Sequence, residues 1–287
     1  MSSLKFILAK HGDELAGVRC RGSGFMVGTV KRIVEMREGR KIQLLNEDIF
    51  TGFTPSQCLV DIRTNRKMQD RLKVETKQYL EIVREIQTAL NKGQPPPESY
   101  GNEFSEIAIE SNRAEAGTIT YRSFAYTFGM QIETIAASAL KNEGYLLAYQ
   151  YGQVDEAVDI LLRSLYELSK VVKRRDAVVA EQIRAIKRTH PEDIIVVTEG
   201  SNHSYFAAEL EREMGAEVHR QPDDVFSYYD EALNGHLEGK MGEPELRRLM
   251  RLEPELNFMI MAGLSFAPQL FAEEHIRLAR AAIEQKI

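Results

Sequence analysis

The apolar run at 194–198 (IIVVT) is the feature that most constrains the fold of this chain. Four consecutive β-branched apolar residues favour a strand, and a strand that is apolar on both faces is typical of the interior of a parallel sheet. Pro191 ends the helical pattern that precedes the run. A helical pattern follows at 203–214 and ends at Gly215, and 216–219 is predicted to be a short strand. This stretch therefore predicts a helix-strand-loop-helix-strand unit.

The rest of the chain supports an α/β fold with a mostly parallel sheet and helices on both faces. Strands are predicted at 104–110 and 130–136, with a helix around 118–128 between them. Helical patterns then dominate the chain on both sides of the apolar run. They cover 155–172, 176–189, 243–251, 255–262 and 271–286.

The first sixty residues are rich in strand patterns, at 4–9, 25–36 and 41–45. They fit a strand-rich N-terminal subdomain or the opening of a larger sheet, and the pattern leaves both open. One long amphipathic helix is predicted over 65–92, and the prolines at 95–97 then favour an extended connector. The predicted organisation is an N-terminal segment 1–60, a helix and connector 61–98, and an α/β domain 99–287 with a helical C-terminal part.

Charge and composition restrict the classes of partner. The net charge of −6 and the pI near 5.7 argue against binding to nucleic acid or to an anionic membrane. Two cysteines cannot form a disulfide framework, and neither a signal-peptide core nor an apolar membrane span is visible. We therefore expect a cytoplasmic protein that acts on a small molecule or a peptide. Its oligomeric state is left open, a homo-oligomer included.

The loop Glu199–His203 is the predicted working point. In open α/β sheets, ligands bind outside the carboxyl ends of the strands, and this loop follows the apolar run. Gly200 permits a sharp turn, and Ser201 or Asn202 can cap the next helix, which leaves backbone N–H groups facing a ligand. His203 can bind a metal or transfer a proton. The alternative interpretation makes Asn202 a plain cap and His203 a surface residue.

A resemblance to a known superfamily adds to this interpretation. Arg175-Asp176, an amphipathic helix, the segment IIVVTEGSNH and the segment AELEREMGAEVHR follow one another over about 175–220. This order resembles the closing pattern of the TraB/GumN and ChaN/erythromycin-esterase-like superfamily, which includes the Tiki metalloproteases. The resemblance implies functional roles for Arg175, Gly200 and His203.

Two further residues enter through weaker parts of the resemblance. Over 104–136, the strand ending in Glu110 is similar to the family strand that ends in a functional glutamate, which implies a metal ligand or general base beside His203. A solvated glutamate is the alternative. His11 follows the first strand, where the family has a second GxxH motif, but Leu8 stands in place of the glycine.

The leading functional hypothesis is a hydrolase. His203, Glu110 and His11 would hold a divalent metal or activate a water directly, and Arg175 would stabilise an anionic substrate or a developing oxyanion. Two alternatives stay open: a non-enzymatic protein that binds haem or another small ligand, and an interaction protein whose site has decayed. Whether the chain is an enzyme at all is therefore left open by the sequence.

Overall fold

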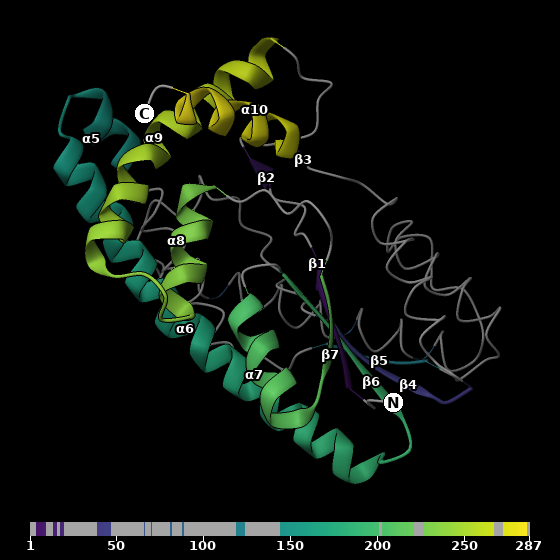
Figure 1. Ribbon diagram of the computed structural model, residues 1–287. Helices are drawn as coiled ribbons and strands as arrows, with labels where there is room; N and C mark the ends of the chain where they lie inside the picture. The colour runs from purple at the N-terminus through teal and green to yellow at the C-terminus, as the bar shows by residue number, and fades with distance from the viewer. Residues whose placement is uncertain are drawn as a thin grey trace.

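The computed structural model of the chain (Figure 1) is built around one five-stranded sheet. In spatial order the strands are β5 (Ile119–Ser123), β4 (Ile42–Asn46), β6 (Ile194–Gly200), β1 (Leu4–Ala9) and β7 (Glu217–Arg220). Every pairing in this sheet is parallel. The residues that the structure describes are 4–9, 14–15, 18–19, 39–46, 66, 70, 81, 88, 119–123, 144–200, 203–220, 227–266 and 272–285.

Strand β6 lies at the centre of the sheet, between β4 and β1. Its residues 194–197 are completely buried, each with 0% exposure. This confirms the prediction of an interior parallel strand, because both faces of a central strand must be apolar when both are covered. The alternation along β1 fixes which side chains share a face, since Leu4 pairs with Ile195 and Leu8 pairs with Glu199.

One face of the sheet packs against two helices, α6 (Val154–Thr189) and α7 (Ser204–Met214). Phe6 of β1 points to this face and meets Phe206 of α7 edge to face, with ring centroids 5.9 Å apart. Residues of the opposite face, such as Val196, are also buried. An α/β fold is therefore shown, and helices over that second face stay a prediction.

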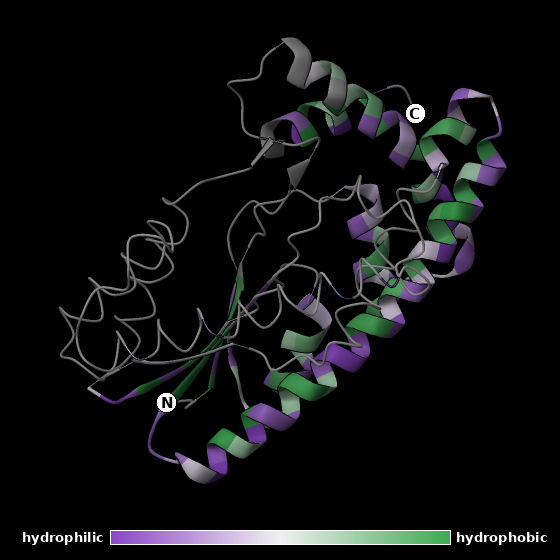
Figure 2. Cartoon of the chain, turned by 180° about the vertical axis from the view of Figure 1, so that it is seen from behind, coloured by the Kyte–Doolittle hydropathy of each residue, from purple (hydrophilic) through white to green (hydrophobic). Residues whose placement is uncertain are grey.

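Helix α6 is 36 residues long and joins two regions of the molecule (Figure 2). At 1.5 Å per residue it extends about 54 Å. It contacts β6 of the sheet and also three helices, namely α5 (Tyr145–Gln150), α8 (Tyr228–Leu237) and α9 (Glu243–Phe266). Hydrophobic and hydrophilic residues alternate along it, as the green and purple bands show. The helix therefore connects the sheet to a helical layer.

The helical layer is completed by α10 (Ala272–Glu284), which packs on α9. Two separate exposed ion pairs add to the contact between α6 and α9, with Arg247 bonded to Asp159 at 2.9 Å and Arg251 to Asp155 at 2.9 Å. Exposed pairs of this kind contribute little to stability, about 0–1 kcal/mol each. Apolar burial is therefore the main source of stability in this layer.

Three predictions of secondary structure need correction. The helix predicted around 118–128 is wrong over 119–123, which form strand β5, because β-branched and aromatic residues there suit a pleated strand. The two helices predicted at 155–172 and 176–189 are one continuous helix, α6. Likewise 243–251 and 255–262 are one helix, α9, which continues through Pro254.

Strands from the first sixty residues belong to the main sheet. β1 and β4 both pair with β6, whereas β2 (Glu14–Leu15) and β3 (Val18–Arg19) form a separate two-stranded antiparallel ribbon. Of the long helix predicted at 65–92, four residues are described, and all four are helical and exposed. The strands predicted at 25–36, 104–110 and 130–136 lie outside the described residues, and the predicted domain limits stay predictions.

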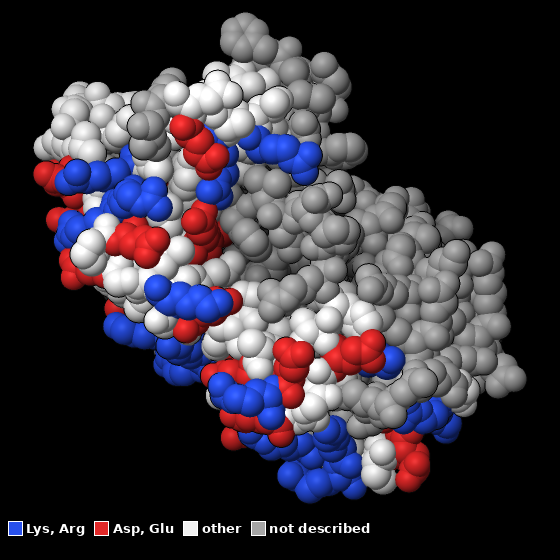
Figure 3. Space-filling view, in the orientation of Figure 1, with Lys and Arg blue, Asp and Glu red and all other residues white. Residues whose placement is uncertain are grey.

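The surface of the described part carries both signs of charge. Lys and Arg gather along the edge where α6 runs and alternate there with Asp and Glu (Figure 3). In this part of the chain, no helix combines the length and the apolar character that crossing a membrane requires.

Candidate metal centre

The carboxyl end of β6 delivers one carboxylate to the face covered by α6 and α7. Glu199 pairs in register with Leu8, so it points to the same side as Val197. It is 2% exposed. A carboxylate at the end of a central parallel strand occupies the position where α/β sheets bind ligands. Glu199 of the predicted loop is therefore a buried side chain at a strand end.

His203 follows at the start of α7 and is also buried, at 3% exposure. It occupies the N-cap position of the helix, and its side chain makes no capping hydrogen bond. The interpretation of His203 as a surface residue is therefore wrong. At the other end of α7, Gly215 adopts the left-handed conformation with φ 64°, which confirms the predicted cap and fixes where the helix ends.

A third buried polar residue, beside Glu199 and His203, comes from the middle of α6. Asp176 is 2% exposed, and its Oδ1 lies 2.9 Å from Nδ1 of His203. Its other oxygen, Oδ2, accepts a hydrogen bond from the Tyr205 hydroxyl. Asp176 thus bonds two side chains of the α7 start and attaches this end of α7 to α6.

These three side chains form one compact group. Ligand atoms of Asp176, Glu199 and His203 all lie within 4.8 Å of one another, and Glu199 Oε2 is 3.6 Å from His203 Nδ1. Two ionised carboxylates at such a separation repel each other by roughly 3 kcal/mol at an effective dielectric constant of ~20. A cation between them would remove this repulsion.

Tyr205 borders the group and stays protonated. Burial raises the pKa of its hydroxyl well above the ordinary value, and the negative charges of Asp176 and Glu199 raise it further. The hydroxyl therefore remains a hydrogen-bond donor to Asp176 at physiological pH. A donor that holds a ligating carboxylate in place is typical of the shell around metal ligands.

The donor types of the group suit a small divalent cation. Two ligands at about 2.1 Å from one ion can stand at most ~4.2 Å apart, and the contacts of His203 Nδ1 with Asp176 and Glu199 fall within that limit. One imidazole nitrogen with two carboxylates suits Zn²⁺, Mn²⁺ or Fe²⁺. The three residues could therefore hold a metal ion, whereas haem stays a prediction without support from this group.

One predicted site residue, Arg175, has a different place in the structure from the predicted one, and several others lie outside the described residues. Arg175 was expected at the start of a helix, but it lies in the interior of α6, buried at 3% exposure. It neighbours Asp176 in sequence, yet it is not one of the three candidate ligands. Gly200 ends β6. The remaining predicted positions lie outside the described residues, namely His11, Glu110, Ser201 and Asn202.

Neither Asp176 nor Glu199 was predicted from the sequence to be a candidate ligand. Asp176 stands next to Arg175 in the matched Arg-Asp pair, but the role was assigned to the arginine alone. Glu199 was included in the predicted loop without a chemical role. Its place directly after the buried run was the available signal, since a charged residue at the end of an interior strand faces either the core or a site.

Comparison with protein-family models, with curated proteins and with solved structures finds no match for this chain.

Proposed function

We propose that this protein is a hydrolase whose site holds one divalent metal ion between Asp176, Glu199 and His203. The observation that carries the proposal is the buried convergence of these three side chains within 4.8 Å at the carboxyl end of β6. Buried carboxylates are costly unless a cation or hydrogen bonds compensate them, so such a group is uncommon without a function. The resemblance to the TraB and erythromycin-esterase-like superfamily supports the same reaction class.

Each residue of the proposed metal centre would have a different role. Asp176 and Glu199 would supply negative charge, and His203 a neutral nitrogen ligand. Tyr205 would hold Asp176 in one orientation through its hydrogen bond. A bound divalent ion supplies Lewis-acid activation of water and of a carbonyl or phosphoryl group. Arg175 keeps its proposed role of stabilising an anionic substrate, which rests on the resemblance alone.

One contact favours a second form of the same reaction, without a metal. The 2.9 Å separation of His203 Nδ1 and Asp176 Oδ1 is an ordinary hydrogen-bond length. If Nδ1 carries the proton, Nε2 has a free electron pair and can accept a proton from water, with Asp176 stabilising the imidazolium. Both forms need His203 and Asp176, but only the metal form needs Glu199 as a ligand.

Hydrolysis assays on chelator-treated protein distinguish the two forms. The protein would be assayed on aryl esters and short peptides before and after addition of Zn²⁺ or Mn²⁺. We expect activity that depends on the metal and falls at least a hundredfold in Glu199→Gln, which keeps the shape of the side chain. His219→Gln is the matched control, because it removes another histidine that pairs with a glutamate, Glu217 of β7, at 3.0 Å.

The outcomes separate the hypotheses. Activity that survives chelation and the loss of Glu199 but not of His203 would favour the metal-free form. Metal binding without hydrolysis of any substrate would favour a binding protein. Equal activity in wild type, Glu199→Gln and His203→Gln would contradict a hydrolytic role for this group.

A further inference from the structure

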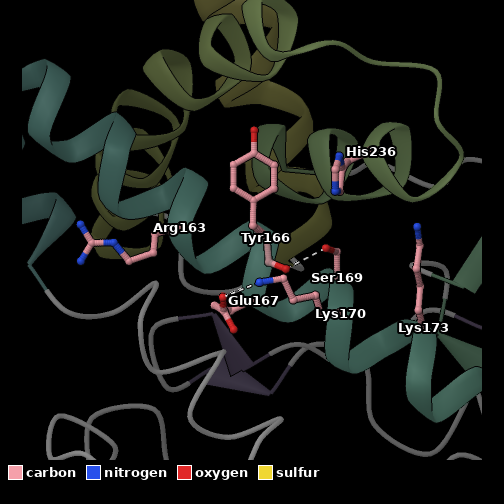
Figure 4. A pocket seen from close by; sticks show the side chains of 7 residues that line it. All are labelled: Arg163, Tyr166, Glu167, Ser169, Lys170, Lys173 and His236. Carbon is pink, nitrogen blue, oxygen red and sulfur yellow. Dashed lines mark hydrogen bonds and ion pairs between the residues drawn. The ribbon is translucent and has the colours of Figure 1, made fainter.

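A second feature lies away from the candidate metal centre, on the flank where α8 meets α6. There the surface is hollowed into a pocket of about 460 Å³, a volume within the range of small-molecule sites. Six of its lining residues come from α6 and one, His236, from α8. Figure 4 shows Tyr166 in its middle, with Arg163 towards one end and Lys173 beside His236 at the other.

The pocket has an excess of positive charge in a protein whose net charge is −6. Arg163, Lys170 and Lys173 follow one another at helical spacing, so they share one stripe of α6. Lys170 pairs with Glu167 at 2.8 Å. Within the described part of the chain, Arg163 and Lys173 form no ion pair. Three cations against one carboxylate leave a local charge of about +2.

Tyr166 and His236 form an aromatic wall of the pocket between these charges. The rings of Tyr166 and His236 meet edge to face, with centroids 5.2 Å apart and an interplanar angle of 71°. Such pairs leave a ring face or edge for a further aromatic group. Burial lowers the pKa of His236, and the nearby charge of Lys173 lowers it further. The imidazole is therefore neutral at pH 7, and its pKa will report any anion that binds beside Lys173.

We propose that this pocket binds a small phosphate monoester that carries an aromatic group. A monoester has a charge of about −1.5 to −2 at neutral pH, which matches the local excess of positive charge. Lys170 and Lys173 would take the phosphate, because compact ammonium groups bind phosphate as point charges. The aromatic group would lie against Tyr166 and His236. This proposal does not depend on the hydrolase proposed above.

Titration of His236 by NMR tests the proposal in the full-length protein, with phenyl phosphate as the probe. We expect phenyl phosphate to raise the pKa of His236 in a saturable manner, because an anion stabilises the imidazolium. The affinity should be at least fivefold higher than for inorganic phosphate, which lacks the ring. His236→Gln would identify the resonance among those of the six histidines.

Lys173→Gln provides a sharper test than His236→Gln. It should change two measured quantities in opposite directions, the pKa of His236 without ligand and the affinity for phenyl phosphate. Without a ligand the variant should raise the pKa of His236, since the charge that depresses it is gone. With phenyl phosphate its affinity should fall at least tenfold. Arg188→Gln, at an exposed position near the end of α6, is the matched control and should bind like wild type.

Three results would overturn the proposal. The first is a His236 pKa that phenyl phosphate does not shift in a saturable way. The second is equal affinity in Lys173→Gln and wild type. The third is equal affinity for inorganic phosphate and phenyl phosphate, which would show that the aromatic wall contributes nothing. Each result is independent of metal binding at Asp176.

Discussion

Within the residues that the structure describes, buried carboxylates occur in two clusters, Glu253 with its donors and Asp176 with Glu199. The two clusters differ in how the negative charge is compensated. In the helical layer, Glu253 of α9 accepts hydrogen bonds from the Tyr229 backbone N–H and from the Asn257 amide, both at 3.0 Å. Its two oxygens each have a donor. At the sheet, His203 and Tyr205 both bond to Asp176, and Glu199 Oε2 lies 3.6 Å from Nδ1 of the same His203.

The difference separates a structural carboxylate from a candidate ligand set. Glu253 satisfies a first-turn N–H of α8 and places a negative charge at the positive end of that helix, which explains its burial without a ligand. The sheet cluster instead brings two carboxylates to one imidazole nitrogen, with Asp176 at 2.9 Å and Glu199 at 3.6 Å from His203 Nδ1. Burial of a carboxylate alone therefore does not indicate a ligand site, and the sheet cluster is a candidate because two carboxylates and an imidazole converge there.

The largest effect on stability is expected from a substitution of Glu253, the structural carboxylate. Glu253→Ala should lower the free energy of unfolding by about 3–4 kcal/mol, because it leaves the buried Tyr229 N–H without its side-chain acceptor, removes one of the two acceptors of the Asn257 amide and opens a cavity. Urea unfolding would measure this loss, which should be the same with and without divalent metal. Glu245→Ala, at an exposed position of α9, should change stability by less than ~0.5 kcal/mol. A metal-dependent loss in Glu253→Ala would erase the distinction between the clusters.

The sheet cluster should respond to metal instead. A divalent ion at a hundred times its dissociation constant should stabilise the wild type by about 2.7 kcal/mol. Glu199→Gln should abolish this gain. It should also make the metal-free protein more stable, because it removes the repulsion with Asp176. Thermal unfolding with and without metal measures both effects, and a variant that is less stable without metal would point to a structural role for Glu199.

The third effect concerns His203. Because its imidazole is buried and bonded to Asp176, His203→Ala should cost about 2–3 kcal/mol in the metal-free protein. The sequence had predicted an exposed residue whose removal leaves stability nearly unchanged, and the burial revises that expectation. An unchanged melting temperature would show that the side chain is exposed in solution after all.

The smallest effect is a change in alkaline stability. The raised pKa of Tyr205 means that the folded protein keeps the hydroxyl protonated above pH 10, where the unfolded chain loses the proton. Its contribution to stability is therefore complete below pH 10 and decreases as the pH rises further. Tyr205→Phe should cost about 1 kcal/mol at neutral pH through the lost hydrogen bond, and its stability should decrease less between pH 10 and 11. Parallel pH profiles would contradict the assignment.

The features predicted correctly from sequence are those that local patterns determine. The run at 194–197 favours an interior strand, since four consecutive β-branched apolar residues suit a strand that is covered on both faces. Gly215 ends α7 because a left-handed residue suits the helix terminus. Both features depend on neighbours within a few positions, so a single sequence contains the information.

The features that were missed depend on tertiary contacts. Arg175 and Asp176 follow two exposed cations and suggested a break between two helices, but both are buried and α6 continues through them. Asp176 meets His203 across 27 positions of sequence, and only the packing of α6 on β6 brings the two together. No periodicity in the chain reports such a contact.

The most direct test of the proposed metal centre is the metal content of the protein after equilibrium dialysis. Wild type dialysed against Zn²⁺ or Mn²⁺ and analysed by mass spectrometry should retain one ion per chain. Glu199→Gln and His203→Gln should each retain at least tenfold less, because each lacks one of three ligands. His219→Gln should retain as much as wild type. Equal metal content in all four proteins, or none in the wild type, would contradict the assignment of Asp176, Glu199 and His203 as a metal site.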